Sequence, residues 1–236
     1  MGLFHPNYDR PGPGIPKGLP PKKGIALFWD ILKREFTNLV SLNLCFLFFS
    51  IPIITIGPAY AAMTKITMRM VWDQNVYVFR DFWQEFKANF RQSFPVSLLQ
   101  AVFMAVLAVS ASFYWQAGQS SQVYVILLGV LLVTCFLLAL MLVYLYPMLV
   151  TIDLPLRAML KNCLILGLCC LKQSLPCVLI NGVILAAVVL FFPYSTFPCM
   201  ILVWSLFALI DSIAAWPGIQ KYVVQKDEEP QTEEQQ

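Results

Sequence analysis

The chain has 236 residues, of which 59% are hydrophobic and 12% are charged, and its formal net charge is +3. A soluble domain carries roughly 25% charged residues, so about half of the usual charge is missing. Several apolar windows also exceed the ~18 residues that mark a membrane-spanning helix, which excludes a soluble globular protein.

Both ends of the chain differ in composition from the middle. Residues 1–24 are rich in proline and glycine, which do not sustain a helix, so we predict a disordered tail. Residues 221–236 have two lysines against five acidic residues, which indicates a disordered acidic tail. Residues 25–220 are then predicted to form a single transmembrane helical domain.

Two apolar stretches, 39–51 and 53–71, open this domain, with Pro52, Gly57 and Pro58 between and within them. A continuous helix through these residues would lose two backbone donors and gain a flexible point. We therefore predict two spans joined by an outer hairpin. Because the first stretch has only 13 residues, a shallow re-entrant loop is the alternative.

Four longer apolar stretches follow, and each has about the 17–25 residues needed to cross a bilayer. They are residues 95–115, 123–147, 175–192 and 197–216. With six spans, all 16 lysines and arginines fall on one side of the membrane, together with both termini. Since basic residues mark the cytoplasmic side, we predict an all-α polytopic membrane protein with about six transmembrane helices and cytoplasmic termini.

Two segments on that side, 24–36 and 79–94, place aromatic residues at helical spacing opposite charged side chains. This pattern indicates amphipathic helices lying in the membrane interface. The second segment is also a candidate surface for docking a partner, although anchoring by its aromatic rings requires no partner. Its candidate docking residues are Phe82, Trp83, Phe86, Lys87, Asn89 and Phe90.

A third segment on the basic side, 151–172, carries Arg157 and Lys161 one helical turn apart. Cationic side chains beside a membrane attract anionic lipids. Arg157 and Lys161 are therefore candidate contacts for lipid headgroups.

Groups that carry common catalytic chemistry are scarce. The single histidine, His5, lies in the predicted tail, so no histidine can activate a serine or cysteine within the membrane. The seven cysteines form no CxxC pair, and no nucleotide-binding glycine loop is present. We expect no enzyme, no catalytic residue, no metal site, no cofactor and no nucleic-acid partner.

Three polar residues interrupt the predicted spans: Asn43, Asn181 and Asp211. An acid within a membrane span commonly contacts a substrate, an ion or a partner. The alternative is hydrogen bonding between helices, for which Asn43, Asn181, Lys65 and Lys172 are candidate neighbours of Asp211.

Three segments together resemble the YesL family, bacterial integral-membrane proteins of unknown molecular function. Residues 42–63 resemble the family's hallmark, residues 79–93 its aromatic and basic segment, and residues 144–168 its third segment. The matching residues of the first are Pro52, Thr55, Gly57, Pro58 and Ala62. Those of the second are Phe82, Phe86, Lys87, Asn89 and Phe90, and those of the third are Tyr144, Pro147, Leu156 and Asn162.

The resemblance implies a multi-pass protein of the cell membrane of a Gram-positive bacterium. Genes of this family commonly lie beside those for carbohydrate ABC importers, which implies an accessory role in sugar uptake. We therefore expect a non-enzymatic accessory subunit or assembly partner of such an importer, in contact with the lipid bilayer and the importer's membrane subunits. The alternatives are a stand-alone transporter or channel for small solutes, lined by Asn43, Asn181 and Asp211, and a lipid-interacting scaffold.

Overall fold

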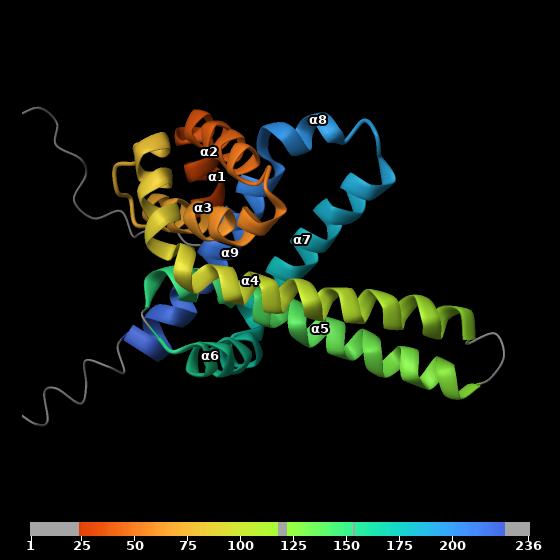
Figure 1. The fold of residues 1–236 in the computed structure, drawn as a ribbon. Helices are drawn as coiled ribbons and strands as arrows, with labels where there is room; N and C mark the ends of the chain where they lie inside the picture. Colours follow the sequence, from red (N-terminus) through yellow and green to blue (C-terminus); the bar gives the residue numbers. More distant parts are fainter. Residues whose placement is uncertain (1–23, 118–121, 153, 225–236) are drawn as a thin grey trace, which may run out of the picture.

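The computed structural model describes residues 24–117, 122–152 and 154–224, and these residues form helices without any strand (Figure 1). Most of the two predicted tails lies outside this described part. The helices in chain order are α1 (Ile25–Arg34), α2 (Phe36–Phe49), α3 (Ile56–Val71), α4 (Val78–Ala117), α5 (Gln122–Thr151), α6 (Leu156–Cys169), α7 (Leu171–Leu190), α8 (Thr196–Pro198) and α9 (Trp204–Ile219). A π-helical turn, Cys199–Val203, joins α8 to α9, so that one helical rod runs through all three.

Four helical stretches in the described residues are long and apolar enough to cross a membrane. They are α4, α5, α7 and the rod from Thr196 to Val223. Three of them contain the predicted spans 95–115, 123–147 and 197–216, and α7 covers the predicted span 175–192 except for its last two residues. The four longer predicted spans are therefore confirmed as apolar helices of spanning length. A helical membrane protein follows from them.

The predicted first and second spans are also helical, but both are short. α2 has 14 residues and α3 has 16, which correspond to about 21 and 24 Å at 1.5 Å per residue. A hydrocarbon core is about 30 Å thick. The predicted count of six spans is therefore not established by helix length.

The predicted interfacial helix 79–94 and the predicted span 95–115 are one continuous helix, α4, of 40 residues. They were predicted as two separate segments, one amphipathic and one apolar, that meet at Pro95. A proline inside a helix removes one backbone hydrogen bond, but the helix can continue with a bend. Figure 1 shows this bend, since the first part of α4 lies at a steep angle to the remainder of the helix.

α3 forms the centre of the fold. Small and apolar side chains on this helix, among them Ala59, Ala62, Met63 and Ile66, are completely buried. α3 packs against α2, α4, α5 and α9, so its position organises both halves of the hydrophobic core.

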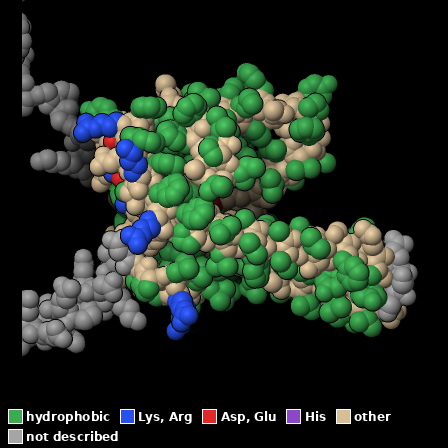
Figure 2. All heavy atoms as spheres, in the orientation of Figure 1, with side chains coloured by type: hydrophobic (Ala, Val, Ile, Leu, Met, Phe, Trp, Pro, Cys, Tyr) green, Lys and Arg blue, Asp and Glu red, His purple; other side chains and the backbone are tan. Residues whose placement is uncertain are grey.

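The outer halves of α4 and α5 form a hairpin that projects beyond the other helices (Figure 1). Its surface is almost wholly apolar and exposed (Figure 2). On the face drawn in Figure 2, the lysines and arginines gather at the opposite end of the molecule. On this face, the basic side chains and the apolar hairpin therefore lie at opposite ends of the molecule.

Candidate functional site: polar clusters among apolar helices

Asp211, on α9, is surrounded by three donors from two other helices. Its carboxylate accepts hydrogen bonds from Asn181 Nδ2 at 2.8 Å, from Cys177 Sγ at 3.2 Å and from Tyr60 Oη at 3.2 Å. Asn181 and Cys177 lie one turn apart on α7, and Tyr60 lies on α3. The cluster ties three helices together around one carboxylate, which is the packing role described above for a buried acid.

This cluster extends towards α5 and α4 through a ring contact. Tyr60 meets Tyr146 edge to face with 4.7 Å between the ring centroids, and the Tyr146 hydroxyl donates to Gln100 Oε1 at 2.9 Å. A second buried polar contact lies nearby, where Thr67 Oγ1 and Ser212 Oγ are 2.8 Å apart. The hydroxyl groups of Tyr146, Thr67 and Ser212 are thus paired with polar groups of other helices.

One atom of the cluster differs from the others. The Oδ1 atom of Asn181 is buried and has no hydrogen-bond partner, although the amide nitrogen of the same side chain donates to Asp211. Of the four candidate neighbours of Asp211, the structure brings only Asn181 into hydrogen bonding with it among the described contacts. Lys65, another candidate, donates instead to the carbonyl oxygen of Val150 at 2.5 Å.

Asn43, on α2, is completely buried and binds the backbone of the π-helical turn. Its Nδ2 donates to the carbonyl oxygens of Cys199 at 3.1 Å and Met200 at 2.8 Å, and its Oδ1 accepts from the Ser205 amide at 3.1 Å. A π-helical turn departs from the usual i to i+4 bonding, and polar backbone groups in a membrane require partners. Asn43 supplies these partners.

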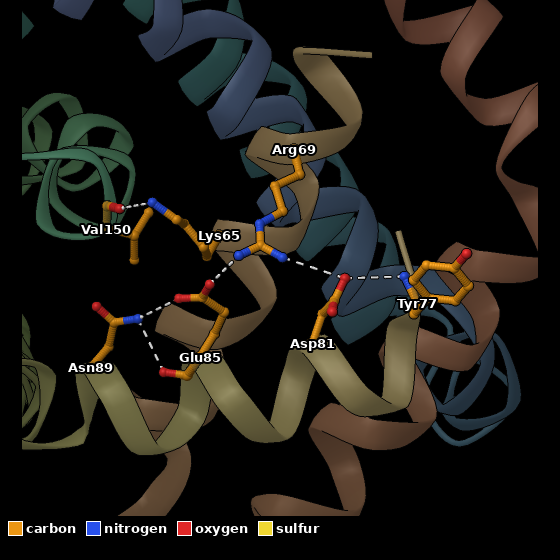
Figure 3. A network of polar contacts seen from close by, with 7 residues as sticks. All are labelled: Lys65, Arg69, Tyr77, Asp81, Glu85, Asn89 and Val150. Atoms are coloured by element: carbon orange, nitrogen blue, oxygen red, sulfur yellow. Dashed lines mark hydrogen bonds and ion pairs between the residues drawn. The ribbon is translucent and has the colours of Figure 1, made fainter. Parts of the chain in front are cut away.

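A charged network joins α3 to α4 at the basic end (Figure 3). The guanidinium of Arg69 pairs with Glu85, and its other terminal nitrogen lies 3.3 Å from Asp81. Asn89 donates to the side chain of Glu85 at 3.1 Å, while Asp81 accepts from the Tyr77 amide at 3.0 Å. The first part of α4 is therefore held to α3 by ion pairs as well as by apolar packing.

The six candidate docking residues separate into two groups. Phe82 and Phe86 are buried in the core, where both rings pack against Phe49 at 5.2 Å between centroids. The side-chain amide of Asn89 is hydrogen-bonded to Glu85, as described above. Trp83, Lys87 and Phe90 are exposed, and Lys87 lies over the Trp83 ring at 4.2 Å.

The docking prediction is corrected for the two buried rings, because side chains that fill the protein's own core cannot contact a partner. For the three exposed residues it stays a prediction. The other interfacial helix, α1, also contacts the protein, since Phe28, Ile31 and Leu32 pack into the core while Ile25 and Trp29 are exposed.

The hallmark residues lie where α2 turns into α3. Thr55 Oγ1 donates to the carbonyl oxygens of Phe49 and Pro52, each at 2.6 Å, and closes the turn. Gly57 is buried where α3 passes α4, and a Cβ there would lie 2.1 Å from the Ser97 side chain. Pro58 and Ala62 are buried within α3.

Several residues of these clusters were not predicted from the sequence. Tyr60 and Cys177 gave no sign of a role because neither is unusual in an apolar helix. Arg69, Asp81 and Glu85 could have been noticed as opposite charges on two adjacent predicted helices. Arg157 and Lys161 are exposed one turn apart on α6, as the headgroup prediction requires.

The fold and these clusters define a helical membrane protein with internally paired polar groups. Residues 39–111 match the family model described as "Protein of unknown function, DUF624". Two of the three YesL-like segments lie within this matched range. Over 146 residues, 61% of this chain, the sequence is 29% identical to the uncharacterized protein YteU of Bacillus subtilis (strain 168).

The chain spans 64% of the length of that relative. No solved structure matches the chain.

Proposed function

We propose that the protein is a YesL-like, non-enzymatic membrane subunit that binds the permease subunits of a carbohydrate ABC importer laterally. The sugar importer is suggested by the YesL resemblance. Lateral binding within the membrane is suggested by the projecting α4–α5 hairpin.

One face of α4 carries this proposal. Ala101, Ala105, Ala108 and Ser112 follow one another at helical spacing and form a narrow stripe. Three of these side chains are alanines, all four are exposed, and Ser112 Oγ is already bonded to the carbonyl oxygen of Val109. Helices in membranes associate where small residues let their backbones approach closely.

The position of this stripe adds to the argument. Ser93 and Ser97, on nearly the same side of α4, face Gly57 at the tip of α3. Gly57 lies at the first turn of α3, so α3 does not extend beyond this contact. The small-residue face of α4 continues past it, along the part of α4 that projects from the other helices. A helix of a partner would extend on α4 the packing that α3 begins.

The test is gentle affinity purification of the tagged protein from its native membranes, followed by mass spectrometry. We expect permease subunits in stoichiometric amounts with the wild-type chain. Ala105→Phe combined with Ala108→Phe should reduce this recovery at least about tenfold, since bulky rings prevent close helix packing.

The matched control is Val102→Phe combined with Val106→Phe, which adds rings to exposed positions on another face of the same part of α4. The control should retain the partner. Recovery of the protein alone, or equal recovery with both pairs of variants, contradicts the proposal.

A stand-alone transporter is the competing function, and Asp211 distinguishes the two. Because three donors of the protein itself already bind the Asp211 carboxylate, we assign it to packing. Liposomes that contain only this protein should show no solute flux. Flux that is lost with Asp211→Asn, in a variant with unchanged thermal stability, would favour the transporter.

A further inference from the structure

We propose that a groove formed by α4, α5 and α6 binds one anionic glycerophospholipid of the leaflet at the basic end. The groove has a volume of about 280 Å³ and lies between these three helices. Its lining is apolar except for Gln100, whose carbonyl oxygen accepts from Tyr146. Representative lining residues are Val96, Leu99, Met104, Leu138, Leu145 and Leu160.

The groove runs in the direction of a lipid acyl chain. On α4 the lining extends from Val96, which follows the charged part of that helix, to Met104. On α5 it extends in the opposite chain direction, from Leu145 near the basic end to Leu138. Eight residues of helix correspond to about 12 Å, which accommodates much of one acyl chain along its length.

Basic side chains lie close in sequence to the residue of α6 that lines the groove. Leu160 of α6 lines the groove, and Arg157 and Lys161 flank Leu160 on the same helix. Both basic side chains are exposed, and α6 contains no acidic residue. Arginine and lysine beside an apolar surface bind a phosphate group while the chain below it is buried.

A phospholipid fits this arrangement better than a second copy of the chain. In a two-fold symmetric contact the same patch would meet itself, and the two Arg157–Lys161 pairs would approach each other. Like charges brought together oppose association. An anionic headgroup complements both cations and carries the apolar chain that the groove requires.

The full-length protein in mild detergent tests the proposal by native mass spectrometry during titration with dioleoylphosphatidylglycerol or dioleoylphosphatidylcholine. The two lipids have the same acyl chains and differ in headgroup charge. We expect the wild-type chain to bind one phosphatidylglycerol in preference to phosphatidylcholine. The double variant Arg157→Gln, Lys161→Gln should weaken phosphatidylglycerol binding about tenfold or more, since each cation near an anionic surface contributes measurably.

Lys33→Gln combined with Arg80→Gln is the matched control, because it removes two exposed cations from α1 and α4, away from the groove. This control should keep the preference for phosphatidylglycerol. Leu142→Trp, which fills the groove from α5, should weaken the binding of both lipids. Equal losses in the control and the Arg157–Lys161 variant overturn the proposal, and so does unchanged binding with Leu142→Trp or a dimer that this variant dissociates.

Discussion

Asn43 stabilises an irregular backbone that lies within an apolar helix. Its amide group meets two carbonyl oxygens of the π-helical turn and the Ser205 amide at the start of α9. An aliphatic side chain would remove these three hydrogen bonds in a membrane, where no water can replace them. The residue therefore determines how α2 and the α8–α9 rod fit together.

We predict that Asn43→Ala lowers the free energy of unfolding by about 2 kcal/mol, since three interhelical hydrogen bonds of roughly 0.6 kcal/mol each are lost. The measurement is the midpoint of thermal unfolding in mild detergent, with tryptophan fluorescence as the probe. Ser41→Ala is the control on the same helix, because Ser41 Oγ binds only the Thr37 carbonyl oxygen of its own helix. Equal midpoints for the two variants would contradict the role given to Asn43.

The candidate site could be predicted from the sequence only in part. Asp211, Asn181 and Asn43 stood out as polar residues in apolar spans, and the pairing of Asp211 with Asn181 was among the alternatives. Tyr60 and Cys177 could not be assigned to the cluster, because which helices are neighbours depends on packing. The burial of Phe82 and Phe86 was missed for the same reason, since an apolar helix face can meet protein or lipid.

At the scale of elements, the approach of α3 to α4 depends on Gly57. The hypothetical Cβ distance of 2.1 Å to Ser97 is far shorter than any van der Waals contact. A side chain at this position requires the two helices to separate. Glycine here serves close packing rather than an unusual backbone angle.

Gly57→Ala should therefore destabilise the protein by about 1–3 kcal/mol, the usual cost of overpacking a well-filled contact. Adding Ser97→Gly to the same chain should restore most of the loss, because it removes the atoms that clash. Thermal midpoints of the single and double variants give the measurement.

Gly129→Ala is the matched control for this series. No atom lies within 4 Å of a Cβ built at Gly129, on the exposed part of α5. Alanine favours a helix over glycine by about 1 kcal/mol, so this variant should be neutral or slightly more stable. A loss of stability at Gly129 as large as that at Gly57 would show that helix contact is not the cause.

The helices themselves could be predicted where one physical requirement dominates. Spanning a membrane needs length and apolarity, and the four longer stretches met both requirements in the sequence. The continuity of α4 through Pro95 could not be predicted in this way, because a proline either ends or bends a helix according to its surroundings.

At the scale of the whole molecule, the α2–α3 hairpin decides the number of spans. Its turn exposes apolar side chains, with Ile53 82% exposed, and the Thr55 hydroxyl is bonded to two carbonyl oxygens within the turn. A turn that meets hydrocarbon needs both properties. Together with the short helices, they favour a re-entrant hairpin that ends inside the bilayer.

We predict that a cysteine at Ile53 is not labelled by a membrane-impermeant maleimide added to intact cells, in a background without the native cysteines. A cysteine at Tyr194, in the exposed turn between α7 and α8, should be labelled under the same conditions. Detergent should make both positions reactive. Equal labelling of the two in intact cells would establish that α2 and α3 cross the membrane, as the count of six spans requires.

The bend of α4 at Pro95 gives the molecule the geometry of a lever. Arg69 fixes the near arm through Asp81 and Glu85, whereas the far arm, from Pro95 to Ala117, has α5 as its main neighbour. The far arm is about 34 Å long at 1.5 Å per residue, so a change of about 10° at the proline would displace its tip by about 6 Å. The outer end of the hairpin is thus the part of α4 whose position depends most on the angle of the helix at Pro95.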